Sequence, residues 1–292
     1  MPVAVPLANA AAAIACALEL GGAWPPRLLT SSHALAPRVR VFRFVDRSRT
    51  IRLPSGKRVP RSLETFVSYP LAVGTYPLVV FAHGYALTPA RYAQLLRAWT
   101  QAGYVVAAPV FPLENPSAPG GPNESDLVNE PRDMSFVISQ LLNGALRGRI
   151  NPSRIAVAGQ SDGAEAALAV AYDRRFRDPR VRAAIVLSGA ALPGMGPFPL
   201  KGPPLLAAQG TADTLNAPAT TAAYFQRARH PKFLLWLLGA SHLPPYTDQQ
   251  PQLGIVERAT TAFLDHYLKS RPLRALDQAA NRPGLTRFIA EP

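Results

Sequence analysis

The sequence contains a single cysteine, Cys16, which excludes an internal disulfide and a cysteine-based zinc cluster. Acidic residues are also scarce, since 18 Asp and Glu stand against 31 Lys and Arg, of which only four are lysine. The basic residues are spread from Arg27 to Arg287 without a dense block or an aromatic-interleaved stripe, so the pattern argues against a nucleic-acid partner. We interpret the positive charge as an arginine-rich, solvated surface.

The chain also lacks an uncharged run long enough for a secure membrane span. Residues 3–18 carry no charge, but the run ends at Glu19 and is shorter than the roughly 20 apolar residues that a span needs. It resembles a signal-peptide hydrophobic region without a basic start, and residues 13–16 match a lipoprotein cleavage box poorly. We expect residues 1–35 to be an apolar leader. Secretion, lipoprotein anchoring and a cytoplasmic location stay open, and a membrane partner is expected only for an anchored form.

What the sequence does contain is an alternation of strand and helix patterns. A chain of 292 residues with 48% hydrophobic residues suits one large α/β domain, predicted over residues 36–292. Two alternating segments, Val39–Val45 and residues 64–70, predict an antiparallel opening. Continuous apolar runs then predict buried strands at Leu78–Ala82, Val105–Ala108, Ile155–Ala158, Ala183–Leu187, Leu205–Ala208 and Phe233–Leu238.

Helical patterns fall between these strands, at Pro89–Ala102, Met134–Leu146, Ala164–Tyr172 and Ile255–Leu268. The alternation predicts a doubly wound, mostly parallel sheet with antiparallel N-terminal strands, in which ligands bind beyond the carboxyl ends of the strands. Residues 111–131 are rich in Pro, Gly, Asn and Ser, and they are predicted to form a long surface loop near that edge.

The sequence Gly-Gln-Ser-Asp-Gly at residues 159–163 joins a buried strand directly to an alanine-rich helix. A serine on such a turn is held in a strained conformation, and the flanking glycines remove Cβ atoms that would clash there. Its hydroxyl is thereby exposed beside the unpaired N–H groups of the helix start. This context makes Ser161 a candidate nucleophile.

A serine nucleophile needs a base to take its proton and a carboxylate to orient that base. Asp213 follows one predicted strand and His242 follows the next, so the chain order is Ser, Asp, His. Taken singly, Asp213 could be an ordinary turn aspartate and His242 a loop histidine. Asp248 is the reserve acid. Three other histidines are worse candidates for the base: His33 precedes the sheet, His230 precedes a strand and His266 lies within the last helix.

The loop after Leu78–Ala82 reads His83-Gly84-Tyr85 and is expected to present a backbone N–H to the nucleophile. We predict an oxyanion hole made by the N–H groups of Tyr85 and Asp162, with Gly84 allowing close approach of the backbone. His83 is interpreted as structural. The Asp162 side chain also has a simpler explanation, because an acidic group in the first turn of a helix is favourable by itself.

With these motifs the sequence resembles the α/β-hydrolase superfamily, and within it the lidless, dienelactone-hydrolase-like serine esterases. That group includes chlorophyllase-like, platelet-activating-factor-acetylhydrolase-like and cutinase-like enzymes. The resemblance spans Val39 to Lys269 and rests on "FAHGY", "GQSDG", "GTAD" and "GASH". It implies Ser161 as nucleophile, His242 as general base and then acid, and Asp213 as the residue that orients it. Dienelactone hydrolases themselves use cysteine, which Ser161 replaces.

The leading functional hypothesis is a carboxylic-ester hydrolase that forms an acyl-enzyme on short, medium-chain or bulky esters, with no metal or organic cofactor. Residues 188–203 are too few for a helical lid. The family's polyester hydrolases carry a tryptophan that "SGAALPGMGPFP" lacks and a C-terminal disulfide that one cysteine cannot form, so a polymeric substrate is an alternative. An amidase or peptidase and a non-catalytic binding module are the others. Pocket candidates are Tyr85, Phe111, Leu243 and Tyr246. The oligomeric state is not indicated.

Overall fold

The computed structural model describes residues 37–144, 146–189, 199 and 201–292, all of which belong to the unit Ala34–Pro292. The predicted leader, residues 1–35, lies outside these ranges. So do residues 190–198 and 200, on which the prediction of no lid and the missing tryptophan largely rest. Within the described part of the chain, no helix is both long and apolar enough to cross a membrane.

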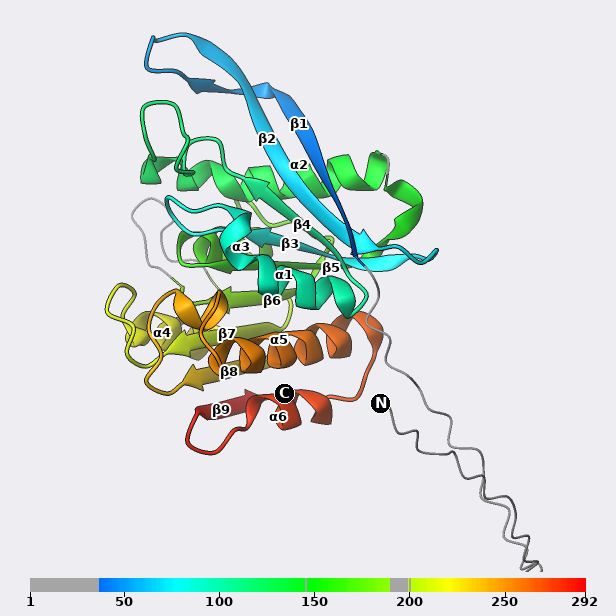
Figure 1. The fold of residues 1–292 in the computed structure, drawn as a ribbon, viewed down its shortest axis with the longest axis vertical. Coiled ribbons are helices and arrows are strands. Elements are labelled where there is room, and N and C mark those ends of the chain that lie inside the picture. The colour runs from blue at the N-terminus through cyan, green and yellow to red at the C-terminus, as the bar shows by residue number, and fades with distance from the viewer. Residues whose placement is uncertain (1–36, 145, 190–198, 200) are drawn as a thin grey trace, which may run out of the picture. The chain divides into compact units, whose positions relative to one another are not determined.

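A nine-stranded mixed sheet runs through the described domain in the order β1-β2-β4-β3-β5-β6-β7-β8-β9 (Figure 1). Strands β3 to β8 pair in parallel, whereas β1, β2 and β9 run antiparallel to their neighbours. The predicted doubly wound sheet with antiparallel N-terminal strands is confirmed. The strand bounds are Pro37–Arg52 (β1), Arg58–Pro70 (β2), Tyr76–Ala82 (β3), Val105–Val110 (β4), Ile150–Gln160 (β5), Val181–Leu187 (β6), Leu205–Gly210 (β7), Lys232–Leu237 (β8) and Thr286–Glu291 (β9).

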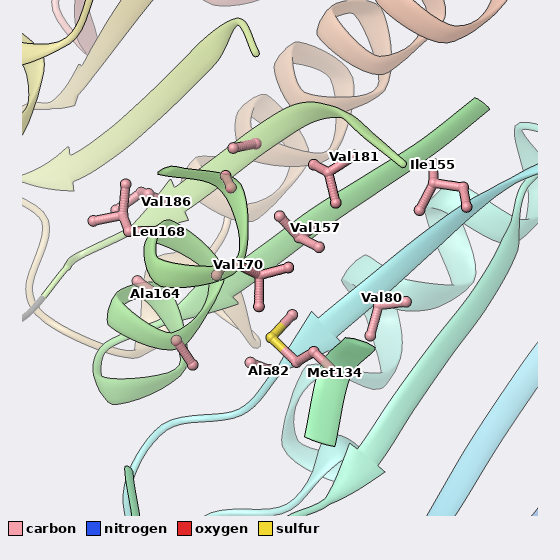
Figure 2. Packing of buried hydrophobic residues seen from close by; sticks show 14 of the residues in the cluster. Val80, Ala82, Met134, Ile155, Val157, Ala164, Leu168, Val170, Val181 and Val186 are labelled. Atoms are coloured by element: carbon pink, nitrogen blue, oxygen red, sulfur yellow. The ribbon is translucent and has the colours of Figure 1, made fainter. Parts of the chain in front are cut away.

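Helices cover both faces of this sheet, which explains why the central strands are continuously apolar. One face carries α1 (Ala93–Gln101), α5 (Gln252–Lys269) and α6 (Arg274–Ala280), and the other carries α2 (Glu130–Asn143), α3 (Asp162–Tyr172) and α4 (Pro218–Arg227). Every residue of α3 is buried, because its small side chains let it lie close to the strands. Figure 2 shows this packing, with Ala164, Leu168 and Val170 of α3 beside Val157 and Val186.

The loop after β4 differs from the prediction of a surface loop over residues 111–131. A short 3-10 helix occupies Glu124–Asn129 and α2 already begins at Glu130, with Pro131 in its first turn. Arg61 of β2, itself buried, ties this segment to the sheet through bidentate ion pairs with Asp126 and Asp133 at distances down to 2.6 Å. The end of the segment, from Asp126 onward, is therefore packed against the sheet, whereas most of residues 116–125 are exposed, as predicted for a surface loop.

Two buried carboxyl groups, Glu114 and Glu130, also lie in this segment. None of their four carboxyl oxygens receives a hydrogen bond from a donor group among the described residues. Burial, the largest cause, raises the pKa of both groups; the Glu114 charge and its hydrogen bond raise the pKa of Glu130 further, whereas the hydrogen bond with Glu130 lowers that of Glu114. Two such groups can bond to each other only while one of them keeps its proton. We therefore treat them as a protonated pair.

The sequence patterns also missed α6 and β9 entirely. Strand β9 pairs antiparallel with β8 at the edge of the sheet and is half-buried to exposed along its length. A short edge strand has only one neighbour and one covered face, so it lacks the continuous apolar run that marked the central strands.

Candidate active site

Ser161 stands between the end of β5 and the start of α3 with φ 56° and ψ −123°. This is a strained conformation for a residue with a side chain, and such strain persists only where the surroundings hold it. A Cβ at Gly159 would lie 2.0 Å from the Gly163 carbonyl oxygen, and one at Gly163 would lie 2.3 Å from that of Ala82. Only glycine fits at either position, so the motif has the geometry that the sequence predicts.

Asp213 and His242 come together from the loops after β7 and β8. His242 Nδ1 lies 2.8 Å from Asp213 Oδ2, and both side chains are largely buried. The other carboxylate oxygen, Oδ1, accepts hydrogen bonds from the backbone N–H groups of Leu215 at 3.0 Å and Asn216 at 2.9 Å. Asp248, the reserve acid, is half-exposed and lies 3.6 Å from Arg91 instead.

The environment keeps Asp213 ionised. Burial by itself raises the pKa of this carboxyl, but the hydrogen bonds from His242, the Asn216 N–H and Gln209 outweigh it, and the net pKa is lowered. Gln209 Nε2 donates to Asp213 Oδ2 at 2.9 Å, while Gln209 Oε1 accepts from Thr221 at 2.7 Å. The carboxylate is thus held in one orientation by four donors, which suits a residue that orients a base.

The Ser161 hydroxyl is hydrogen-bonded to neighbours other than the base. Its Oγ donates to Asp162 Oδ1 at 3.3 Å and accepts from Asn216 Nδ2 at 3.4 Å. No hydrogen bond joins Ser161 to His242 in the described residues, and His242 Nε2 lies 3.2 Å from Gln160 Nε2. Catalytic hydrogen bonds are often formed only when substrate is bound, so this arrangement fits a resting site.

The loop that carries Tyr85 approaches the nucleophile closely. A Cβ at Gly84 would lie 3.2 Å from Ser161 Cβ and 2.9 Å from Gln160 Oε1, so a larger residue would push the loop away. Within the described part of the chain, the Tyr85 N–H donates no hydrogen bond. The Asp162 N–H opens α3, where first-turn N–H groups have no partner inside the helix. These two N–H groups therefore stay the predicted oxyanion-hole donors, with the Asp162 N–H shared with its own carboxylate.

The Asp162 side chain adds a charge at the same place. Burial, the largest cause, and the nearby Glu124 charge raise the pKa of Asp162 to about 6, although hydrogen bonds from Ser161 and from its own backbone N–H lower it. Its Oδ2 is buried without a donor in the described residues. Above pH 6 the carboxylate therefore competes with a developing oxyanion for the Asp162 N–H.

His83 is fully buried and bonded on both ring nitrogens. The Phe111 N–H donates to His83 Nε2 at 3.1 Å, so Nδ1 carries the hydrogen and donates to the Gly84 carbonyl at 2.9 Å. Burial lowers the pKa of His83 to about 4, which keeps the ring neutral. Its contacts support the structural role predicted for it, because the ring links the Gly84 loop to the end of β4.

The four pocket candidates divide into two pairs. Tyr85 is 41% exposed and its hydroxyl donates to the Pro122 carbonyl at 3.1 Å, and Leu243 is partly buried. Phe111 and Tyr246, in contrast, have no exposed surface: Phe111 packs in the core and Tyr246 bonds to Ser188 and to the Ala208 carbonyl. The pocket prediction is therefore wrong for Phe111 and Tyr246, which support the site from within the core.

Sequence reasoning missed the amide side chains that surround the predicted triad. Gln160 and Gln209 are both fully buried near the carboxyl ends of β5 and β7, and Asn216 contacts the serine hydroxyl. A glutamine inside an apolar strand run was an available signal, since a buried amide needs partners. Within the described residues, no group of three or more His, Cys, Asp or Glu side chains could hold a metal ion.

An apolar cavity of about 400 Å³ lies elsewhere, between α1 and strands β1, β2 and β4. Its lining includes Val39, Phe66 and Leu96 but none of the residues around Ser161. We therefore place the candidate chemistry at the carboxyl edge of the central strands, where the strained serine stands, and not in this cavity.

Comparison with known proteins identifies the family and the fold of the chain. A family model described as chlorophyllase matches residues 45–220. The chain is 27% identical to chlorophyllase-2 from Arabidopsis thaliana over 157 residues, which are 53% of this chain and 48% of that protein, so the match spans about half of the relative's length. A solved structure of a ferulic acid esterase from Streptomyces cinnamoneus matches with a TM-score of 0.67 at 21% identity, over 87% of this chain and 96% of that one. This likeness confirms the predicted α/β-hydrolase fold.

Proposed function

Because the chain belongs to the chlorophyllase family of α/β-hydrolases, we propose that it is a serine hydrolase that cleaves carboxylic esters through an acyl-enzyme. The observation that carries the proposal is the strained Ser161 at the start of α3, with the His242–Asp213 pair in the neighbouring loops. The shared resemblance to named esterases supports the reaction class. The predicted substrates are short, medium-chain or bulky esters.

The reaction begins when substrate displaces the Ser161 hydroxyl from Asp162 and turns it toward His242 Nε2. Oγ then attacks the ester carbonyl carbon while its proton passes to Nε2, and the carbonyl oxygen becomes an oxyanion near the Tyr85 and Asp162 N–H groups. Collapse breaks the bond to the alcohol, which leaves with the proton from His242. Water, deprotonated by the same ring, releases the acid and restores Ser161.

Asp213 acts throughout by holding His242 Nδ1–H and by stabilising the imidazolium that each proton transfer creates. Each oxyanion donor of this kind generally contributes about 2.7 to 4 kcal/mol to stabilising the transition state. None of these steps requires a metal ion or an organic cofactor.

Hydrolysis of a nitrophenyl ester series of increasing acyl length tests the proposal, together with a ferulate ester and chlorophyll, which the relatives' names suggest. Wild type is compared with Ser161→Ala and with a matched control, Ser153→Ala, at the exposed opposite end of the same strand. We expect hydrolysis by wild type and the control and its loss in Ser161→Ala. Equal activity in all three would refute the proposal, as would a folded wild type that neither hydrolyses an ester nor reacts with a serine-directed phosphonate.

A further inference from the structure

Gln160, the last residue of β5, stands directly before the nucleophile and has no part in the steps above. Its side chain is fully buried, yet both ends of its carboxamide are bonded. Oε1 accepts from the Tyr92 hydroxyl at 2.7 Å. Nε2 lies 3.2 Å from the His242 carbonyl oxygen and 3.2 Å from the ring nitrogen Nε2 of the same residue. A buried amide thus bridges the loop after β3 and the loop that carries the base.

The direction of the hydrogen bonds follows from the first donor in this chain. The Gly84 N–H can only donate, and it donates to the Tyr92 hydroxyl oxygen at 3.2 Å. Burial raises the pKa of Tyr92 far above the neutral range, so the hydroxyl keeps its single proton. That proton points to Gln160 Oε1. The NH₂ end of the carboxamide must therefore face His242.

This orientation decides which ring nitrogen of His242 carries hydrogen. Nε2 faces an N–H donor, so it is the acceptor nitrogen of a neutral ring. Nδ1 then carries the hydrogen and donates it to Asp213 Oδ2 at 2.8 Å. A general base that takes a proton on Nε2 needs this tautomer.

We propose that Gln160 is a positioning residue that holds His242 as the neutral tautomer with Nε2 unprotonated, so that its lone pair accepts only the 3.2 Å contact from the amide until the Ser161 proton replaces it. The proposal rests on the proposed serine-hydrolase function. Tyr92 acts through Gln160, because it fixes the direction of the amide and joins the base to Gly84 beside the predicted oxyanion hole. When His242 takes the proton of Ser161, Nε2 becomes a donor and the amide N–H loses that acceptor. Gln160 therefore favours the neutral ring over the imidazolium.

Replacing the NH₂ group by an acceptor inverts this preference. In Gln160→Glu a carboxylate of nearly the same shape still accepts from Tyr92, but it also accepts from His242 Nε2–H and attracts the imidazolium. An opposite charge at this distance shifts a titration by about one to three pH units. We expect the acidic side of the pH profile of kcat/KM to shift to higher pH by at least about one unit. Near neutral pH, kcat/KM should be about tenfold lower than in wild type, and it should recover at higher pH.

Tyr92→Phe removes the group that directs the amide, so a smaller shift in the same direction is expected. The control is Tyr104→Phe, which removes another buried tyrosine hydroxyl that donates to Asp265 at 2.6 Å, and it should leave the limb in place. The ionisable groups coupled to His242 are Asp213 and Asp162, with Glu124 acting on Asp162. All three are the same in every variant.

The titration of the His242 ring is followed in parallel by NMR, with its resonance assigned from His242→Asn, so that the test has a readout besides activity. A midpoint that rises in folded Gln160→Glu, and rises less in Tyr92→Phe, supports the proposal. A midpoint that is the same in Gln160→Glu and wild type overturns it. Failure of the proposed function is a separate result, namely a wild type whose hydrolysis does not depend on Ser161.

Discussion

Asp213→Asn is expected to abolish most of the proposed activity without disturbing the fold. The orientation of the new amide is fixed by the backbone, because Oδ1 receives the N–H groups of Leu215 and Asn216 and only an oxygen is acceptable there. The NH₂ group must then take the place of Oδ2. There it faces His242 Nδ1 and Gln209 Nε2, both of which donate to the carboxylate in the wild type.

The magnitude follows from the tautomer that this change imposes. His242 Nδ1 becomes an acceptor for the new NH₂ group, so the ring hydrogen moves to Nε2. Nε2 then opposes the Gln160 amide and can no longer take the Ser161 proton. Loss of the correct tautomer in a Ser-His-Asp site costs about 10⁴-fold in kcat, or about 5.4 kcal/mol of transition-state stabilisation. KM should change little, because Asp213 is separated from the substrate by His242.

The assay is nitrophenyl ester hydrolysis with kcat and KM determined separately, and thermal unfolding by circular dichroism establishes that the variant folds. Asp248→Asn is the matched control. It makes the same chemical change at a half-exposed residue whose ion pair with Arg91 contributes little. A folded Asp213→Asn enzyme that keeps more than about a tenth of the wild-type kcat would refute the role assigned to Asp213.

Two further predictions concern carboxyl groups with raised pKa values. Asp162 has a pKa of about 6 and is mostly charged above that pH, whereas Asp162→Asn carries no charge at any pH. A negative charge about 5 Å from the oxyanion, at an effective dielectric constant of about 50, destabilises the transition state by about 1.3 kcal/mol. In a pH profile, kcat/KM of the variant should therefore be about tenfold that of wild type above pH 7, and the two should become equal below pH 5. A ratio that does not change with pH would contradict the competition between the carboxylate and the oxyanion. Burial raises the pKa of Glu114 and Glu130 in the folded protein. Between about pH 4.5 and these raised pKa values, the unfolded chain binds fewer protons than the folded protein. The free energy of unfolding therefore falls as pH rises, by about 1.4 kcal/mol per pH unit for each group. Glu130→Gln leaves one such group and an amide that can donate to it, so urea unfolding should show a smaller loss between pH 5 and pH 8 than in wild type; an equal loss would exclude the pair as its cause.

The parts of this protein that could be predicted from the sequence are those encoded by neighbouring residues. The strain at Ser161 follows from a strand, two glycines and a helix that are contiguous in the chain. The central strands follow from apolar runs, because helices cover both of their faces. Asp213 and His242 were predictable because parallel strands end at one edge, so polar residues just after two such strands are brought together.

The interactions that could not be predicted join distant segments whose pairing leaves no local pattern. Gln160 is 68 positions from Tyr92 and 82 from His242, and a single glutamine gives no indication of either partner. Glu114 and Glu130 are similar, since charged residues in a Pro- and Gly-rich segment suggest an exposed loop. Arg61 of β2 fixes Asp126 and Asp133, on either side of Glu130, to the sheet, and this long-range pairing leaves no local pattern.

The resting arrangement of the site separates two requirements of catalysis. His242 is held by Asp213 on Nδ1 and faced by the Gln160 amide at Nε2, which in the proposed arrangement makes Nε2 the nitrogen that accepts the proton. Ser161, in contrast, is bonded to Asp162 and not to the base. Substrate therefore has to supply only a reorientation of one hydroxyl and the displacement of one carboxylate from the Asp162 N–H. Both changes are favoured when Asp162 is neutral, since a protonated carboxyl is a weaker acceptor for Ser161 and for that N–H. The balance between a prepared base and a restrained nucleophile thus depends on the charge of one residue, the one that follows the serine.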